Sequence, residues 1–387
     1  MDVPRTLLVT NDFAPRVGGI QRTLEALVKH LPSDRVAVLC PRHEDASAFD
    51  EAAPYRVFRQ PERFLWPTPE IGRRVRNAAL EFGAEVVLFG ATYPLALLGP
   101  GLARSGTPYV AAAHGFEYWL SISPGAHALM RRATSEASWI AVMCSRFVAR
   151  VVRTAVPDHV PVSVLYPGAD VEAFGPDLPT ADIRARHELA GRPLVVCVSR
   201  MVPRKGQDVL IRAMSRIRGR VPDPALLLVG DGPYRPKLER LAARAPEGSV
   251  VFAGQVGEDD LPRYYCAGDV FAMPCRNRFG GLEVEGWGNV FIEAAACGRP
   301  VVVGDSGGAR ESLVPGSTGF LVDGRDDGAV ADAVGSLLSD PARADAMGHA
   351  GRERVERSFT WSRAAAELVD GLRRAISQPP RGHGARG

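Results

Sequence analysis

The sequence predicts an α/β protein with two doubly wound parallel-sheet domains, and three observations predict this fold class. The 387 residues are 46% hydrophobic and 24% charged, a length and composition that suit two ordinary globular domains. Short aliphatic and β-branched runs alternate with segments of helical periodicity, as in successive βαβ units. The alternation stops between residues 174 and 193, where prolines, glycines and charges indicate a linker.

The first half of the chain supplies five predicted buried strands. Each run is rich in Val, Leu, Ile or Ala and is followed by a loop, which is typical of parallel strands covered on both faces. Between them, the segment IQRTLEALVKHL at residues 20–31 has the spacing of an amphipathic helix. We place an N-terminal domain at residues 1–175, with strands at 6–10, 35–40, 85–90, 109–114 and 139–144.

The second half repeats this organisation and ends in a helix. QDVLIRAMSRI at residues 207–217 reads as a helix between two strands. After Ser358 the helical pattern of residues 359–377 has no strand to follow it, so we expect a terminal helix that packs on an existing domain. We place the C-terminal domain at residues 176–357, with strands at 193–199, 225–230, 250–254, 269–274 and 300–304.

Charge and cysteine content exclude several classes of protein. The net charge is only +3, so the chain lacks the concentrated basic surface of a nucleic-acid binder. Its six cysteines are scattered without a C-x-x-C pair, which indicates a reducing, cytoplasmic compartment. We expect no signal peptide and no membrane span, because the longest uncharged run, 86–103, contains prolines and glycines. A membrane-associated form would therefore lie on the membrane surface.

Three strand-to-helix loops could hold a phosphate. Gly18 and Gly19 precede the first helix, where bare amides attract anions, although the glycines could equally serve only a tight turn. Arg200 and Lys205 flank the loop after residues 193–199, and Lys205 is one of only three lysines in the chain, although chance remains an alternative. Gly230, in VGDGP, reads better as a turn beside such a site.

Glu285 and Glu293 raise a question of spacing. On one helix they would lie about 12 Å apart along the axis, too far to act on one atom. Gly286 and Gly288 instead place Glu285 in a loop, with a helix that begins near Asn289 and contains Glu293 in its second turn. The amides of residues 289–291 would then face the same space as Glu285. Amide donors beside carboxylate acceptors suit a ligand that carries both phosphates and hydroxyl groups.

Five stretches in this order resemble one known family, the retaining nucleotide-sugar-dependent glycosyltransferases of family four. These are NDFAPRVGGI, AHGFEYW, SRMVPRKGQD, VGDGP and EGWGNVFIEAAACGRPVVVGDSGGARE, and the resemblance extends over residues 5–375. It implies the GT-B fold, in which two Rossmann-like domains face a cleft and the C-terminal helix returns to the N-terminal domain.

The resemblance also implies roles for individual residues. Glu285 would bind the hydroxyls of the donor sugar and Glu293 those of the ribose. Arg200 and Lys205 would bind the diphosphate, with Gly19 and the amides of Asn289, Val290 and Phe291. His114 would approach the sugar from the other domain, and Asp12 matches an acid on the acceptor side. The base would be read around AGQVGEDDL, which includes Val256, mostly by backbone. No metal and no other cofactor is implied.

TNDFAPRVGGIQ, FLWPTP and CRNRFGGLEVEGWGNVF resemble a bacterial subgroup that transfers mannose from GDP-mannose to the inositol O6 of phosphatidylinositol monomannoside. The implied partners are a nucleotide sugar and a lipid acceptor, without nucleic acid; the oligomeric state stays open. A lipid acceptor implies a peripheral protein on the inner face of the plasma membrane. Predicted membrane contacts are apolar anchors next to arginines, namely Phe64, Trp66, Arg73, Arg74 and Arg76.

Several alternatives stay open. The arginines could be a solvated face and Trp66 could belong to the core. A second set with helical spacing, Arg146, Arg150 and Arg153, is a further candidate for membrane contact. Other functions on the same fold are transfer of another nucleotide-linked sugar, or transfer to a soluble inositol, a polysaccharide or a natural product. A non-catalytic sugar-nucleotide-binding module and a nucleotide-sugar epimerase are the rivals from other classes.

Overall fold

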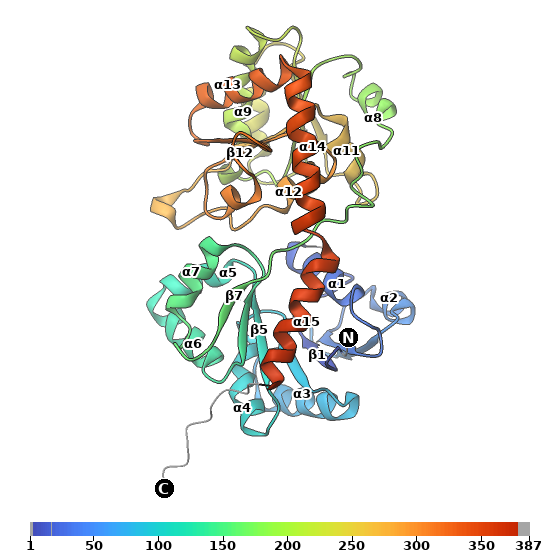
Figure 1. The fold of residues 1–387 in the computed structure, drawn as a ribbon, viewed down its shortest axis with the longest axis vertical. Coiled ribbons are helices and arrows are strands. Elements are labelled where there is room, and N and C mark those ends of the chain that lie inside the picture. Colours follow the sequence, from blue (N-terminus) through green and yellow to red (C-terminus); the bar gives the residue numbers. More distant parts are fainter. Residues whose placement is uncertain (1–2, 17, 378–387) are drawn as a thin grey trace. The chain divides into compact units, whose positions relative to one another are not determined.

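The computed structural model describes residues 3–16 and 18–377, which form two units (Figure 1). Unit 1 runs to Pro167 and includes the helix that starts at Trp361, and unit 2 is Gly168–Thr360. These limits differ from the predicted boundaries at residues 175 and 357 because the linker bonds to unit 2. The amide of Ala169 donates to the carbonyl of Phe359 at 2.8 Å, and Arg352 donates to the carbonyl of Val171 at 2.8 Å.

Unit 1 contains a seven-stranded sheet in which all pairs are parallel, in the order β3-β2-β1-β4-β5-β6-β7. The five predicted strands are confirmed. The sequence did not predict β3, where arginines interrupt the apolar pattern, or β7, which has three residues. The strands are β1 (Thr6–Val9), β2 (Val36–Pro41), β3 (Arg56–Gln60), β4 (Val86–Phe89), β5 (Tyr109–Ala113), β6 (Trp139–Val142) and β7 (Val162–Val164).

Helices cover both faces of this sheet. They are α1 (Gly19–Lys29), α2 (Ala46–Ala52), α3 (Pro69–Phe82), η1 (Leu95–Leu98), α4 (Gly99–Arg104), α5 (Phe116–Ile122), α6 (Pro124–Thr134), α7 (Arg146–Thr154) and α15 (Trp361–Ser377). Helix α15 is the predicted terminal helix, and it packs on α1 and the sheet (Figure 1). Its Leu368 and Leu372 are buried with Leu24 and Leu27 of α1. A side chain at Gly371 would lie 2.1 Å from the ring of Trp139, so only glycine allows this approach.

Unit 2 contains a six-stranded parallel sheet in the order β10-β9-β8-β11-β12-β13. Its strands are β8 (Leu194–Val198), β9 (Ala225–Val229), β10 (Val250–Gly254), β11 (Val270–Met273), β12 (Val301–Gly304) and β13 (Gly319–Val322). Its helices are α8 (Ala181–Arg186), η2 (Pro203–Lys205), α9 (Gln207–Arg218), α10 (Arg235–Ala242), α11 (Leu261–Ala267), η3 (Phe279–Gly281), α12 (Asn289–Ala296), η4 (Ala309–Ser312), α13 (Asp327–Leu338) and α14 (Pro341–Ser358).

Both strand orders reverse direction once, and this reversal positions the candidate sites. In unit 1 the chain crosses from one side of β1 to the other at β4, and in unit 2 it crosses from one side of β8 to the other at β11. Loops at the carboxyl ends of two such strands diverge and leave a crevice, which is the usual ligand site of open α/β sheets.

Among the described helices, none combines the length and the apolar character that crossing a membrane requires.

Candidate active site

The loops that follow β8 and β11 meet at the crevice of unit 2. The amide of Arg276, after β11, donates to the carbonyl of Arg204, after β8, at 2.9 Å. Gly206 makes this contact possible, because it has a φ of 80° and a Cβ there would lie 2.0 Å from the carbonyl oxygen of Pro274. The turn at Gly206 starts α9 and places Lys205 at the junction of the two loops.

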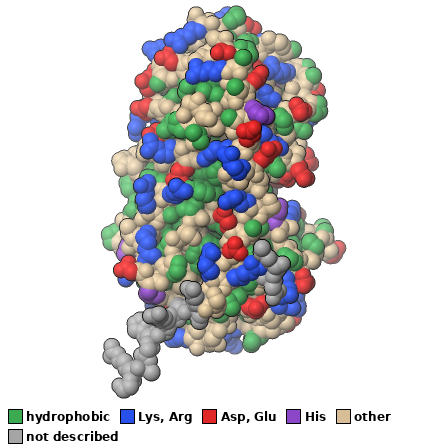
Figure 2. Space-filling view, viewed as in Figure 1, with side chains coloured by type: hydrophobic (Ala, Val, Ile, Leu, Met, Phe, Trp, Pro, Cys, Tyr) green, Lys and Arg blue, Asp and Glu red, His purple; other side chains and the backbone are tan. Residues whose placement is uncertain are grey.

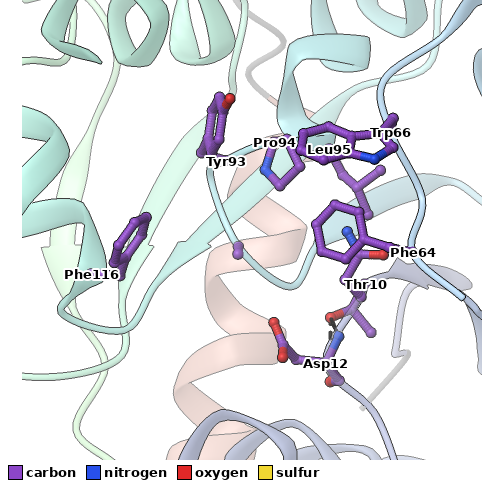
Figure 3. A pocket seen from close by; sticks show the side chains of 10 residues that line it. Thr10, Asp12, Phe64, Trp66, Tyr93, Pro94, Leu95 and Phe116 are labelled. Carbon is purple, nitrogen blue, oxygen red and sulfur yellow. Dashed lines mark hydrogen bonds between the residues drawn. The ribbon is translucent and has the colours of Figure 1, made fainter.

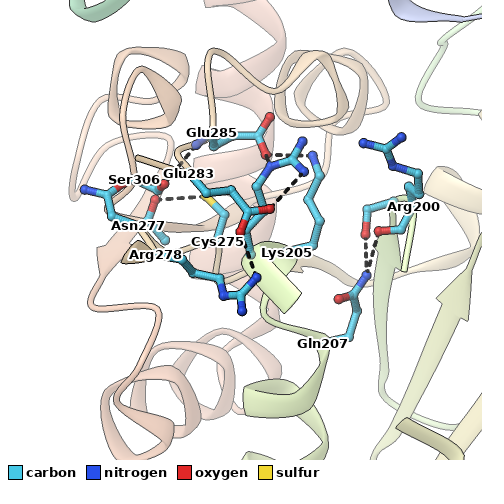
Figure 4. A network of polar contacts seen from close by, with 12 residues as sticks. Arg200, Lys205, Gln207, Cys275, Asn277, Arg278, Glu283, Glu285 and Ser306 are labelled. Carbon is cyan, nitrogen blue, oxygen red and sulfur yellow. Dashed lines mark hydrogen bonds and ion pairs between the residues drawn. The ribbon is translucent and has the colours of Figure 1, made fainter. Parts of the chain in front are cut away.

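Lys205 forms a buried ion pair with Glu285 (Figure 4). The Lys205 Nζ lies 2.7 Å from Glu285 Oε2, and the Arg204 Nε lies 3.7 Å from the same oxygen. Both partners of the pair are less than a tenth exposed, at 9% for Lys205 and 6% for Glu285. Burial by itself would raise the pKa of Glu285, but Lys205, Arg204 and Arg200 together outweigh burial and hold that pKa below its ordinary value. Glu285 is therefore ionised at neutral pH.

The loop after β12 holds Glu285 in place through the backbone. The Glu285 amide donates to Ser306 Oγ at 3.0 Å, and the Glu285 carbonyl accepts from the Gly308 amide at 2.9 Å. Gly307 has a φ of 52°, and a Cβ there would lie 2.2 Å from the Glu285 carbonyl oxygen. Oε1 of Glu285 receives no hydrogen bond from any residue that the structure describes. This oxygen can therefore accept a hydrogen bond from a ligand hydroxyl.

Helix α12 begins at Asn289 and ends at Ala296, as predicted, with Glu285 in the loop before it. Gly288 caps it with a φ of 89°, and the ring of Phe291 lies 2.7 Å from where a Cβ of residue 288 would be. One part of the prediction is wrong: the Phe291 amide donates to the Gly288 carbonyl at 3.1 Å, so it does not face a ligand. The amides of Asn289 and Val290 are the remaining donors of the predicted three.

Glu293 lies on α12 one turn after Asn289 and contacts Tyr265 of α11. The Tyr265 hydroxyl donates to Glu293 Oε2 at 2.6 Å. Burial, followed by the charge of Glu293, raises the pKa of Tyr265 well above its ordinary value, so the hydroxyl stays protonated and keeps donating. Sequence reasoning missed Tyr265, because its position in an apolar helix gave no signal. The role of Glu293 toward a ribose stays a prediction.

Arg200 is exposed at the end of β8, and its guanidinium makes no hydrogen bond or ion pair with any residue in the described ranges. Gln207 stabilises the end of β8 by donating to Ser199 Oγ at 2.8 Å and to the Arg200 carbonyl at 3.2 Å. Figure 4 shows the Arg200 guanidinium on the same side of the network as the Lys205 ammonium. An unpaired guanidinium on the same side as an ammonium that Glu285 contacts through one oxygen favours an anion as ligand.

Gly230 and Val256 occupy supporting positions. Gly230 has a φ of 115°, and a Cβ there would lie 2.3 Å from the Ser199 carbonyl oxygen, so the glycine lets the loop after β9 lie against the loop after β8. This geometry agrees with a turn beside the site. Val256 is half-buried and packs partly against the core of unit 2.

Unit 1 has its own pocket at the point where its sheet reverses. The pocket has a volume of about 220 Å³, and Thr10, Asn11 and Asp12 follow β1 while Ala91, Tyr93, Pro94 and Leu95 follow β4. The other lining residues are Phe64, Trp66 and Phe116. Figure 3 shows Tyr93 and Phe116 on one side, Phe64 and Trp66 on the other, and the Asp12 carboxylate pointing toward the space between them.

Asp12 is the one acid that lines this pocket. Gln21 donates to its Oδ1 at 2.8 Å, and its Oδ2 receives no hydrogen bond from the described part of the chain. Burial raises the pKa of Asp12, while His114 and Arg16 act in the opposite direction.

Gly18 makes room for the Gln21 side chain, because a Cβ at position 18 would lie 2.3 Å from Gln21 Oε1. Gly19 is the first residue of α1, and a Cβ there would meet no atom within 4 Å.

His114 follows β5 and is held in a neutral form. Its Nε2 lies 2.8 Å from the Gly90 carbonyl oxygen, and that acceptor requires a proton on Nε2. Burial lowers the pKa of His114, although Glu117, the Gly90 carbonyl and Asp12 act to raise it. In a neutral imidazole with the proton on Nε2, Nδ1 is a hydrogen-bond acceptor. His114 can therefore accept a hydrogen bond from a ligand hydroxyl but cannot donate one through Nδ1.

Glu117 is a buried carboxylate that sequence reasoning missed. It is 2% exposed. Its Oε2 accepts from the amides of His114 at 2.8 Å and Gly115 at 3.2 Å, and its Oε1 accepts from the Thr92 hydroxyl at 3.1 Å. Glu117 thus joins the loops after β4 and β5, which carry pocket residues and His114. The available signal was an acid three residues after the end of the predicted strand at residues 109–114, in what the structure shows to be the first turn of α5.

The predicted membrane contacts divide into three groups. Phe64 and Trp66 are 39% and 57% exposed, so Trp66 is not a core residue, and their rings lie 4.8 Å apart in the wall of the unit 1 pocket. Arg74 is neutralised by ion pairs with Glu62, at 2.9 Å, and with Glu70. Arg73 is exposed and Arg76 is half-buried.

Comparison with known proteins gives full-length matches. The family described as Glycosyltransferase Family 4 matches residues 17–173, and that described as Glycosyl transferases group 1 matches residues 192–340. A protein of Mycolicibacterium smegmatis named GDP-mannose-dependent alpha-(1-6)-phosphatidylinositol monomannoside mannosyltransferase is 45% identical over 383 residues, 95% of this chain and 99% of the relative. A Corynebacterium glutamicum protein, named as the transferase for the monoacylated substrate, is 37% identical over 95% of this chain and 97% of its own.

Solved structures show the same fold. HepE of Anabaena, in complex with UDP, superimposes with a TM-score of 0.80 at 20% identity and covers 95% of this chain and 99% of its own. The two parallel-sheet, Rossmann-like units are therefore those of the GT-B fold, as predicted. From the extent of the sequence matches and from this architecture, we conclude that the chain belongs to the family-four glycosyltransferases.

Proposed function

We propose that this protein transfers mannose from GDP-mannose to the inositol O6 of phosphatidylinositol monomannoside, with retention at the anomeric carbon. The observation that carries the proposal is the arrangement of Arg200, Lys205 and Glu285 at the carboxyl ends of β8 and β11, directly before α12. The names of the full-length relatives support the choice of donor and acceptor.

Unit 2 would hold the donor. Arg200 offers an unpaired guanidinium fork and Lys205 a compact charge, and both suit the two phosphates of a nucleotide diphosphate. The amides of Asn289 and Val290, at the start of α12, add donors and the positive end of the helix dipole. Glu285 would bind a sugar hydroxyl through Oε1 while its Oε2 keeps Lys205 in position. As the bond to the sugar breaks, these groups stabilise the negative charge that develops on the diphosphate.

Unit 1 would hold the acceptor ring in the pocket that contains Asp12. Its volume of about 220 Å³ is below the ~300–1,000 Å³ of sites that enclose a drug-sized ligand, so it suits one ring and not a whole glycolipid. Aromatic walls pack against the C–H faces of a polyol ring, and Asp12 Oδ2 accepts a hydrogen bond from a hydroxyl. An acyl chain would leave this carboxylate oxygen without a donor in a dry pocket, which is unfavourable.

At the anomeric carbon of the donor sugar, the C–O bond to the diphosphate breaks and a C–O bond to the acceptor forms. The acceptor hydroxyl forms the new C–O bond on the face from which the diphosphate departs, and its proton passes to the departing phosphate oxygen. We propose that Arg200 and Lys205 provide the charge neutralisation that a metal ion can supply at such a site. Neutral His114 would accept a hydrogen bond from a donor-sugar hydroxyl through Nδ1. The guanine base would lie at residues 253–261, as the resemblance implies.

Mass spectrometry of the lipid product tests this function. Purified protein is incubated with phosphatidylinositol monomannoside and, separately, with GDP-mannose, UDP-glucose or UDP-N-acetylglucosamine. We expect one hexose to be added with GDP-mannose and no addition with the other donors. Addition from a UDP-sugar would change the donor assignment, and loss of donor without any change in the lipid would contradict the acceptor. Product formed without acceptor would favour an epimerase.

A further inference from the structure

Exposed apolar side chains gather on α5 and α6 of unit 1. On α5, Phe116 is 59% exposed, Trp119 39% and Ile122 40%, and their spacing of three residues puts them along one side of the helix. Glu117 and Ser121 lie on the other side and are buried. Leu129 of α6 is 41% exposed. Large apolar groups that stay exposed together mark an interaction surface.

The same region carries an excess of positive charge. Residues 116–154 contain five arginines and two glutamates, so their net charge is 5 − 2 = +3, equal to that of the whole chain. One of the two acids, Glu117, is buried under four hydrogen bonds, which leaves the surface more positive than this sum. Arg131, Arg132 and Arg150 form no ion pair with any residue that the structure describes. Arg153 differs, since it forms an ion pair with Asp158 at 3.6 Å and donates to the carbonyls of Val160 and Val156.

Helices α5, α6 and α7 form one structural group. Helix α5 packs against both of the others, and Tyr118 of α5 stacks on Phe147 of α7 with ring centroids 5.8 Å apart. Figure 1 shows the three helices together at one side of unit 1. In the view of Figure 2, Lys and Arg side chains outnumber acidic ones over the part of unit 1 where α7 lies. The apolar stripe and the arginines therefore lie on one group of packed helices.

We propose that this surface, formed by α5, α6 and α7, docks the protein on an anionic phospholipid bilayer. The inference rests on the proposed lipid acceptor. Apolar side chains enter the interface and unpaired arginines contact the anionic headgroups, which together give peripheral binding. A protein partner fits less well, because Arg131, Arg132 and Arg150 form no ion pair with any described residue, and such arginines suit a uniformly anionic surface.

The position of Phe116 connects docking to the acceptor site. Phe116 begins the exposed stripe of α5 and also lines the pocket that contains Asp12. A bilayer bound along α5 would therefore lie beside the mouth of this pocket, at the level of the lipid headgroups. The predicted contact at residues 64–76 changes accordingly: Phe64 and Trp66 line the pocket, and Arg74 contributes little because Glu62 and Glu70 pair with it.

Vesicle co-sedimentation of the full chain tests the proposal. Vesicles of phosphatidylcholine alone are compared with vesicles that also contain phosphatidylinositol. We expect the wild-type protein to bind the anionic vesicles, and W119S/I122S and R131E/R132E each to weaken this binding by about tenfold or more. Added salt should weaken binding of the wild type, because the arginine contribution is screened.

Matched controls come from α3 of the same unit. L80S removes a leucine that is 81% exposed, and R73E/R76E reverses two charges of the membrane contact that the sequence predicts. Both controls should bind anionic vesicles like the wild type, and melting curves check that all variants are folded. Unchanged vesicle binding by both W119S/I122S and R131E/R132E would overturn the proposal. Loss of binding only in R73E/R76E would assign the membrane contact to α3.

A second readout separates this inference from the proposed function. W119S/I122S should transfer mannose at the wild-type rate to a deacylated, water-soluble monomannoside, but more slowly to the same headgroup in vesicles. If the wild type transfers mannose to neither acceptor, the proposed function fails while the vesicle data still decide the docking surface. Equal loss of rate on both acceptors would contradict a docking role for α5.

Discussion

Replacing Lys205 by methionine should expose the energetic role of the buried ion pair in unit 2. Met keeps the length of the side chain and removes the charge, so Glu285 would remain 6% exposed without its partner at 2.7 Å. Removing one partner of a buried pair destabilises a protein by about 3–5 kcal/mol. Arg204 lies 3.7 Å from the same oxygen and compensates in part, so we expect the lower end, about 3 kcal/mol.

The pH dependence of stability should change sign at this site. In the wild type the pKa of Glu285 lies below its ordinary value, so its stabilising contribution is present at neutral pH and is lost as pH falls through the lowered pKa. In K205M burial would dominate and raise the pKa of Glu285 above that of the unfolded chain. The carboxylate would then destabilise the fold at neutral pH, and stability would recover as pH falls and the carboxyl takes up a proton.

Fluorine NMR of protein labelled with 5-fluorotryptophan measures this in unit 2 alone. Trp287 is the only tryptophan within residues 168–360, so its resonance reports the unfolding of that unit in urea. R200A is the control, because Arg200 is exposed and is the smallest of the three cationic contributions to the pKa of Glu285, so its removal should change the unfolding midpoint far less than K205M. If K205M unfolds at the wild-type urea concentration with the same pH dependence, the ion pair has no structural role and the reasoning is refuted.

Three further predictions follow from the site. R200A should lower turnover by about two to three orders of magnitude, since it removes a charge that stabilises the leaving diphosphate, and near-normal steady-state kinetics would contradict this role. E117Q should lower the pKa of His114 further, because the charge of Glu117 raises that pKa. NMR titration of His114 measures the shift. The control T92V removes only one hydrogen-bond donor to Glu117 and should leave the pKa of His114 almost unchanged. Exhaustive treatment with EDTA should leave the initial transfer rate unchanged, and a loss of rate that Mg²⁺ restores would show that Arg200 and Lys205 do not suffice.

The sequence predicted the strands that are central in the two sheets better than those at the edges. β8, β11 and β12 read as continuous apolar runs because both of their faces are buried. The missed strands β3, β7 and β13 all lie at the edge of a sheet, where one side bonds to no other strand. In β3 two arginines flank only two apolar residues, and β13 starts with Gly319, so neither shows the same pattern.

Local features of the candidate site were predictable, and contacts between distant segments were not. Gly286 and Gly288 indicated correctly that Glu285 lies in a loop before α12. Nothing in the sequence indicated that Glu285 would pair with Lys205, because the strand order brings their loops together. Loss of the Phe291 amide as a donor depends on the bend at Gly288, a conformation that glycine permits but does not dictate.

A crystal structure of the protein with GDP-mannose tests the donor site in unit 2 most directly. We predict that the diphosphate contacts Arg200, Lys205 and the Asn289 amide, and that Glu285 Oε1 accepts a hydrogen bond from a mannose hydroxyl. A diphosphate bound away from the carboxyl ends of β8 and β11, with the Lys205–Glu285 pair facing no part of the nucleotide sugar, would contradict the account.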